Sequence, residues 1–208
     1  MNLFDKSQVA ENLGAQLLHP GSRILFRHWE TLRAERACPN RDEIQLRTLS
    51  KLMPNLAIIE PGSEPNTPIF KLAGTAVCEL FQRLLTGQQV AEGFDRFERR
   101  VIGETLSLSF DRLQPCLIRL RFIGSEDEVN TAELLALPVH NARTCQTQLF
   151  CGLFPFAETK RSFSQTLSRI ELVSTRMIWT EHLNGDRLME EVGRKAAPAF
   201  RVIHGGLN

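Results

Sequence analysis

The segment over residues 116–123 constrains the fold most strongly, because its side chains alternate between apolar and cationic. Apolar side chains occupy positions 116, 118, 120 and 122, and Arg119 and Arg121 lie between them. A period of two is typical of a β-strand with one buried and one exposed face, as antiparallel sheets contain. The chain is therefore expected to build an antiparallel sheet.

Helical and extended patterns follow one another in an order that favours an α+β domain. Two hairpins separated by a helical crossover, without strand–helix–strand alternation, predict an antiparallel sheet with the helices gathered on one face. Residues 167–179 fit either a sixth extended segment or a helix. The expected helices span residues 22–37, 40–53, 75–86 and 94–114, and the expected strands span 56–59, 68–73, 116–123, 131–139 and 146–154.

Charge and cysteine content exclude several classes of protein. The 208 residues include 25 Lys and Arg against 24 Asp and Glu, so the net charge of +1 offers no bulk attraction to nucleic acid or an acidic membrane. No apolar run approaches the roughly 18 residues of a membrane helix, and the N-terminal residues lack a signal-peptide pattern. The five cysteines form no C-x-x-C pair, which predicts free thiols in a reducing cytoplasm.

Three blocks of sequence carry a resemblance to a known family. In their order and spacing they resemble the PAS domain family, and in particular the stand-alone bacterial PAS group, over about residues 22–157. The blocks are HWETLRAER over residues 28–36 with Pro39, Arg41, Asp42 and Ile44; FKLAGT over residues 70–75 with residues 80–81 and 85–87; and residues 137–139 with 150–153.

The resemblance implies a cupped, five-stranded antiparallel sheet facing helices, with an N-terminal helical cap, used for sensing or protein–protein contact in bacterial signalling. It divides the chain into a flexible arm (1–21), a PAS-like domain (22–157) and a C-terminal extension (158–208) that it does not cover. Within the domain, the cap spans residues 22–53 and the core 54–157. PAS domains commonly dimerise through the cap and the outer sheet face, so a homodimer is expected. The sequence holds no Asn-Cys-Arg flavin-adduct motif, and no kinase, cyclase or DNA-binding output region is expected in it.

The expected cup brings an apolar face of strands against an apolar face of helices. These residues either fill a core at normal packing density or line a cavity for a small, mostly apolar ligand, and both alternatives stay open. Neither haem nor flavin is expected as a cofactor. The candidate lining residues are Phe81, Leu84, Phe97, Ile118, Leu120, Leu135, Leu149 and Cys151.

The expected cap helix carries an apolar stripe outside the core, and such a stripe needs a cover. Leu25, Trp29 and Leu32 are therefore expected to contact a second copy or another protein partner. Arg33 and Arg36 either join that contact or pair with carboxylates and hold the cap in place. Arg119 and Arg121 are likewise expected to form surface ion pairs or to bind a partner.

Catalysis is the competing hypothesis. An enzyme acting on a small hydrophobic substrate would need an acid, base or nucleophile inside the cup, and Glu133 and Cys151 are the inward candidates. Cys145 and His140 lack a third, orienting group, and the histidines form no pair with metal-ligand spacing. We therefore expect a non-catalytic sensory or adaptor module that binds a protein partner, without metal, nucleic acid or membrane insertion.

Overall fold

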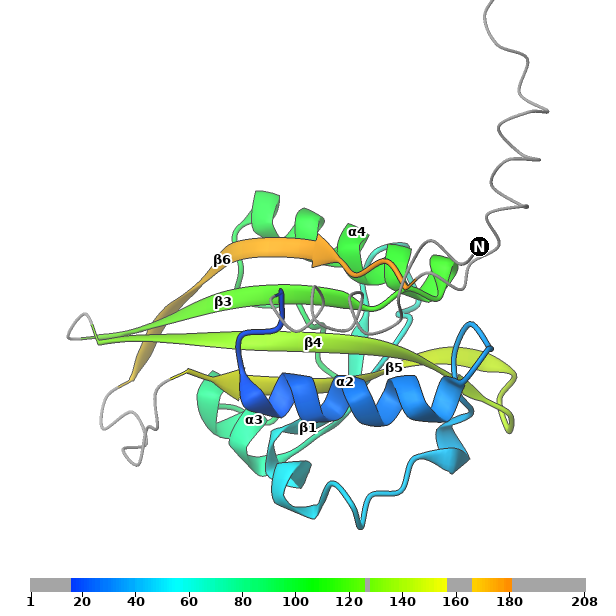
Figure 1. Cartoon of the computed structure of the whole chain (residues 1–208). Helices are drawn as coiled ribbons and strands as arrows, with labels where there is room; N and C mark the ends of the chain where they lie inside the picture. The colour runs from blue at the N-terminus through cyan, green and yellow to red at the C-terminus, as the bar shows by residue number, and fades with distance from the viewer. Residues whose placement is uncertain (1–15, 126–127, 157–165, 181–208) are drawn as a thin grey trace, which may run out of the picture.

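A six-stranded antiparallel sheet organises the computed structural model, which describes residues 16–125, 128–156 and 166–180 (Figure 1). The strand order is β2-β1-β5-β4-β3-β6, so the α+β class is confirmed. The strands are β1 (Leu56–Glu60), β2 (Ile69–Ala73), β3 (Cys116–Gly124), β4 (Val129–Asn141), β5 (Gln146–Pro155) and β6 (Leu167–Met177). The helices are α2 (Pro20–Arg33), α3 (Thr75–Phe81) and α4 (Arg96–Arg112), with 3₁₀ turns η1 (Arg41–Glu43) and η2 (Ser50–Asn55).

Strand β6 extends the sheet beyond the expected five strands. It pairs antiparallel with β3 along its length, with Val173 left as an extra residue between the partners of Arg119 and Leu120. The sheet therefore includes residues 167–177, which lie in the expected C-terminal extension (158–208). The pattern of β6 was ambiguous because an edge strand with a bulge has no regular alternation of buried and exposed side chains.

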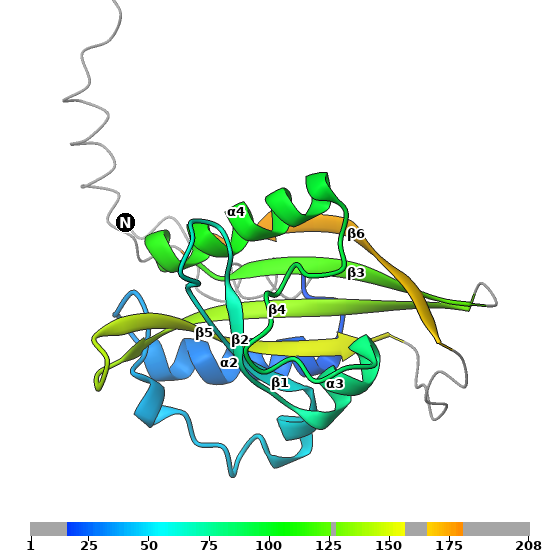
Figure 2. The same cartoon turned by 180° about the vertical axis from the view of Figure 1, so that it is seen from behind.

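Helices cover both faces of the sheet, which corrects the expectation that they gather on one face. Figure 1 shows α2 across one face, and Figure 2, from behind, shows α3 and α4 on the other. The α3–α4 side, called the inner face here, packs on Ile118, Leu120 and Cys151. The α2 side, the outer face, packs on Leu117 and Leu137. Two separate apolar clusters therefore stabilise the sheet, one on each face.

Helix α2 begins earlier than the expected Ser22. Pro20 occupies its first turn, and the His19 side chain caps it by accepting a hydrogen bond from the Gly21 backbone N–H at 3.0 Å. A Cβ at Gly21 would lie 2.6 Å from the Phe154 ring, so glycine lets the helix start lie close against β5. Leu17, just before the helix, is buried in the outer cluster. The expected arm (1–21) is therefore packed at its C-terminal end; residues 1–15 lie outside the described residues.

The segment between α2 and β1 does not form the helix expected over residues 40–53. The capping box of Asn40 and Glu43 starts one 3₁₀ turn, and the backbone then becomes extended at Ile44. Leu49 is buried in the outer cluster, and Ile44 and Leu52 pack against it. A short helix is marginal without a packing surface along one whole side, and here separate apolar contacts hold an irregular path instead.

Helix α4 matches its expected position, whereas α3 begins as expected but ends at Phe81 instead of residue 86. Asp95 and Glu98 form a capping box at the start of α4, with Asp95 Oδ1 accepting from the Glu98 backbone N–H at 2.8 Å. Left-handed residues end both helices, Gln82 after α3 and Leu113 after α4. Because α3 stops at Phe81, Leu84 lies beyond the helix rather than on its buried side.

Candidate functional site

The inner cup, between the sheet and helices α3 and α4, is a filled core. Its internal void measures about 10 Å³ and is lined by apolar side chains including Phe81, Ile118 and Leu120. A single water molecule needs roughly 10–15 Å³ by this measure, so the void holds one water at most. Of the two alternatives left open by the sequence, the structure has the filled core.

Five of the eight expected lining residues lie in the inner cluster. Phe81, Ile118 and Leu120 line the void, and Leu149 and Cys151 are buried beside it. Their position follows from the strand alternation and the helical spacing that predicted it.

Leu135 was wrongly assigned to the cup. In the register of β3 and β4, Leu134 lies opposite Ile118, and Leu135 lies opposite Leu117. Leu135 therefore points to the outer face and belongs to the outer cluster. Strand β4 is buried on both faces along most of its length, so its sequence shows no alternation from which the facing side could be read.

Leu84 and Phe97 were also wrongly assigned to the cup. Leu84 is 84% exposed and Phe97 is 73% exposed. Leu84 lies after the end of α3, and Phe97 lies on the solvent side of α4, whose buried face carries Ile102, Leu106 and Phe110.

Two buried thiols at the inner face, those of Cys116 and Cys151, are held in the un-ionised form. Burial raises the pKa of Cys116 to about 12 and raises the pKa of Cys151 well above its ordinary value. Both cysteines flank Ala136 on neighbouring strands, which places them about 10 Å apart at the usual strand spacing. A disulfide needs closer Cα atoms, and a nucleophile needs the thiolate, so Cys151 is a packing residue.

Glu133, the acid considered for catalysis, lies on the outer face. Its carboxylate is fully buried and accepts hydrogen bonds from the backbone N–H groups of Leu18 and His19, each at 3.2 Å. Arg119 Nη2 lies 3.6 Å from it. Glu133 thus fixes the chain before α2 against β4, and the inner void has only apolar residues in its lining.

Helix α2 buries the apolar stripe that was expected to meet a partner. Leu25 and Trp29 are buried in the outer cluster, and Leu32 is half-buried. Trp29 Nε1 donates to the Pro138 carbonyl oxygen at 2.6 Å, which ties the helix to β4. These residues are therefore core contacts within one chain, because the outer sheet face covers the stripe.

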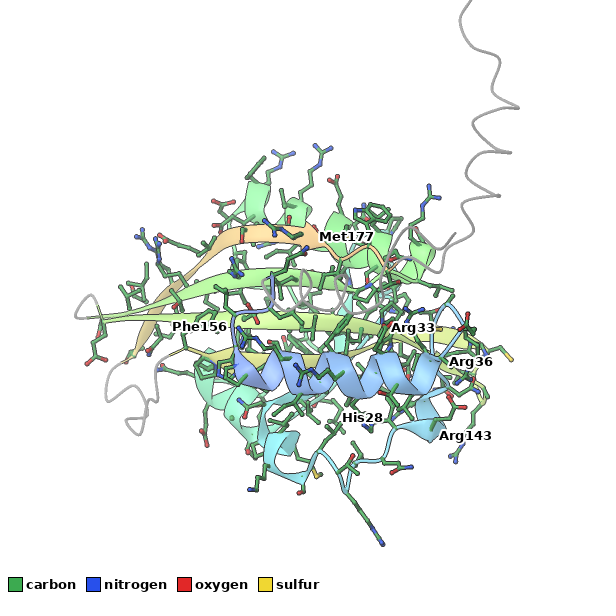
Figure 3. The ribbon with its side chains drawn as sticks, in the orientation of Figure 1. His28, Arg33, Arg36, Arg143, Phe156 and Met177 are labelled. Carbon is green, nitrogen blue, oxygen red and sulfur yellow. The ribbon has the colours of Figure 1, made fainter. Side chains whose placement is uncertain are left out.

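Arg33 and Arg36 take the alternative role, pairing with carboxylates. Arg33 is buried, forms two hydrogen bonds to Glu30 at 2.6 and 2.8 Å, and lies 5.2 Å from the centre of the Trp29 ring. Arg36 pairs with Glu43 at 2.8 Å and so joins the end of α2 to η1. Figure 3 shows both arginines at the C-terminal end of α2, with His28 in its middle.

Arg119 and Arg121 also have partners within the chain. Arg119 donates to the Gln16 carbonyl oxygen at 3.0 Å besides its contact with Glu133. Arg121 Nη1 lies 3.2 Å from Glu171 and joins β3 to β6. Among the described residues, no group of three His, Cys, Asp or Glu side chains could hold a metal ion.

A larger cavity lies on the outer face, where sequence analysis expected none. It measures about 220 Å³, opens to solvent, and lies over β1, β2 and β5 beside the segment from η1 to η2. Its lining is apolar except for Arg41. The sequence does not predict this cavity because the helix expected over residues 40–53 would have placed these side chains differently.

The geometry defines an α+β domain whose inner cup is filled by apolar side chains. A family model described as PAS domain matches residues 17–154, more than half of the chain. The chain belongs to the PAS domain family, as the resemblance implied. The search of curated proteins returns no match. No helix among the described residues is long and apolar enough to cross a membrane.

Proposed function

We propose that this PAS domain is a non-catalytic sensory or adaptor module that acts by binding a protein partner, and that the simplest partner is a second copy of the chain. The observation that carries the proposal is the filled inner cup. A void of about 10 Å³ lined by apolar residues leaves room neither for a substrate nor for an acid–base pair. The free thiols support a reducing, cytoplasmic location.

The partner surface we propose is formed by α4 and β6, because the stripe on α2 is buried. Glu98 Oε1 accepts a hydrogen bond from the Leu172 backbone N–H at 2.8 Å. Phe97 and Val173, next in sequence to these two residues, are 73% and 48% exposed. We call Phe97, Val173 and the edge of β6 the α4–β6 surface. Exposed apolar side chains beside an edge strand are typical of a contact surface.

Strand pairing supplies the geometry for such contact. Strand β6 is hydrogen-bonded to β3 on one side and has no other neighbour among the strands of the described residues. The backbone groups on its far edge offer a partner strand the same antiparallel ladder, and the apolar side chains give that pairing specificity. A signal would then act by shifting the population of paired and unpaired modules.

The enzyme hypothesis has no comparable support. It depends on Glu133 and Cys151. Glu133 lies on the outer face, where its carboxylate holds the chain before α2. Burial raises the pKa of Cys151, which keeps its side chain as the un-ionised thiol.

Sedimentation velocity of the full chain over a range of concentrations tests the proposal. We expect a monomer–dimer equilibrium that Val173→Glu shifts at least about tenfold toward monomer, since a carboxylate in an apolar contact must be desolvated. Leu84→Glu is the matched control, because Leu84 is more exposed and lies outside the α4–β6 surface. A chain that stays monomeric at every concentration, or a dimer unaffected by Val173→Glu, contradicts the proposed surface.

A further inference from the structure

The 220 Å³ cavity on the outer face has the form of a binding groove. Buried Leu56, Ile58 and Phe150 lie at its lining, together with half-exposed Leu46 and Leu72. Leu72 lies opposite Ile58 in the register of β1 and β2, so both side chains are on the same face of the sheet. The groove thus has an apolar floor and an apolar wall that is open to solvent.

The side chain of Arg41 places a positive charge at this groove. Arg41 Nη1 donates to Gln148 Oε1 at 3.0 Å, and Gln148 is only 1% exposed. Gln148 Nε2 in turn donates to Glu60, whose other oxygen lies 3.4 Å from Lys71 Nζ. The buried amide therefore orients the Arg41 guanidinium from behind.

Arg41 makes no ion pair with a carboxylate among the described residues. Two glutamates near it are paired with other cationic side chains. Glu60 is paired with Lys71, and Glu43 is paired with Arg36. A guanidinium presents donors on two edges, and the hydrogen bond to Gln148 uses one Nη1 donor. An oriented arginine with donors to spare, beside an apolar groove, is complementary to a carboxylate that carries an apolar tail.

We propose that this groove binds a small amphipathic monocarboxylate, with its carboxylate on Arg41 and its hydrocarbon tail along Leu72 and Phe150. An apolar cavity of about 150 Å³ accommodates benzene, which has six carbon atoms, and this groove is larger, at about 220 Å³. A tail of about six to eight carbon atoms therefore fits. The site lies on the opposite face from the inner cup and does not depend on the α4–β6 surface, so it stands independently of the proposed function.

Sodium octanoate is the probe, compared with 1-octanol and octylammonium in an amide-detected NMR titration of the full chain. We expect saturable octanoate binding with shifts centred on residues 41–46, 56–58 and 72. Octanol is expected to bind at least about tenfold more weakly, since it cannot form the charge-assisted pair. Shortening the acid by one methylene is expected to weaken binding about fourfold.

Two variants separate the head-group contact from the tail contact. Arg41→Gln is expected to weaken octanoate at least about tenfold and to leave octanol unchanged, since only the charge-assisted pair is lost. Leu72→Glu is expected to abolish binding of both, because it places a carboxylate on the groove wall. Val129→Glu is the control, since Val129 is as exposed as Leu72 (55% against 53%) and does not line the groove.

Three outcomes overturn the proposal. The first is the absence of saturable octanoate binding. The second is octanoate affinity that Arg41→Gln does not change, which would place the acid elsewhere. The third is self-association that Leu72→Glu abolishes while octanoate does not compete, which would make the groove an interface between copies. Loss of dimerisation in Val173→Glu with octanoate binding intact would instead concern the α4–β6 surface alone.

Discussion

Glu98 joins the N-terminal turn of α4 to the bulge in β6. Its Oε1 accepts from the Leu172 backbone N–H at 2.8 Å, and its Oε2 accepts from the Asp95 backbone N–H at 3.4 Å. One carboxylate therefore completes a capping box and also fixes an edge strand at the point where its register shifts. The exposed Phe97 and Val173 owe their relative position to this contact.

Removing the Glu98 carboxylate should loosen β6 before the rest of the sheet. We expect Glu98→Ala to lower the free energy of unfolding by about 1–2 kcal/mol, since it removes both the Glu98 contact with the Asp95 backbone N–H and the hydrogen bond to Leu172. Faster hydrogen exchange at the Leu172 amide measures the local effect. Glu104→Ala, which breaks only the exposed pair with Arg100, should cost less than about 0.5 kcal/mol. Unchanged exchange at Leu172 would contradict the assigned role.

The outer face should behave as a core. We expect Leu135→Ala to lower the free energy of unfolding by about 2–5 kcal/mol, as truncation of a buried leucine does. Leu84→Ala, at a side chain that is almost fully exposed, should change it by less than about 0.5 kcal/mol. Urea denaturation followed by tryptophan fluorescence measures both. Equal effects of the two substitutions would argue against helices on both faces.

Histidine burial should make the fold less stable under mildly acidic conditions. Burial lowers the pKa of His28, and it lowers that of His19 despite the opposing charge of Glu133. A base whose pKa is lower in the folded state binds protons more readily when unfolded. Stability should therefore be full above pH of about 7.5 and should fall as the pH decreases through about 6.5, the ordinary histidine value.

Substitution of His28 tests this dependence. His28 Nε2 is buried and has no hydrogen-bond partner within the part of the chain that the structure describes, so His28→Leu should reduce the loss of stability between about pH 7.5 and 5.5. Glu43→Gln is the comparison variant, because Glu43 should affect stability in a different pH range. Arg36 lowers the pKa of the Glu43 carboxyl, so the contribution of Glu43 should be lost only below its ordinary pKa of about 4.3. Identical pH profiles of His28→Leu and wild type between pH of about 7.5 and 5.5 would rule out His28 as the cause.

The rate at which each cysteine reacts with a thiol reagent should depend on how deeply its side chain is buried. Cys145 is exposed in the turn after β4, whereas Cys116 and Cys151 are buried and have raised pKa values. With a thiol reagent at pH of about 8, we expect one fast phase from Cys145 that disappears in Cys145→Ser. Cys116 and Cys151 should react only as the protein unfolds. A fast phase that persists in Cys145→Ser would contradict this order.

Local patterns predicted the positions of the strands and of α3 and α4 well. The alternation around Arg119 and Arg121 identified β3, and turn residues identified the ends of β1, β2, β4 and β5. The pattern failed where a strand is buried on both sides, as at Leu135, and where separate contacts replace a helix, as between η1 and η2. In both places the facing side of a residue depends on which neighbour covers it, and spacing alone carries no information about that neighbour.

The candidate sites were less predictable than the fold. The stripe of Leu25 and Trp29 was recognised as needing a cover, yet the cover is the sheet of the same chain. The groove at Arg41 depends on residues from β1, β2 and β5 and from the segment that was expected to be a helix.

The amino-acid sequence by itself determined the family, the α+β class and the order of the main elements, because hydrophobic periodicity and turn residues act locally along the chain. Tertiary structure alone decided that the cup is full, that α2 belongs to the core and that a groove lies beside Arg41. These properties depend on the volume left between elements after packing, and that volume follows from contacts between residues far apart in sequence.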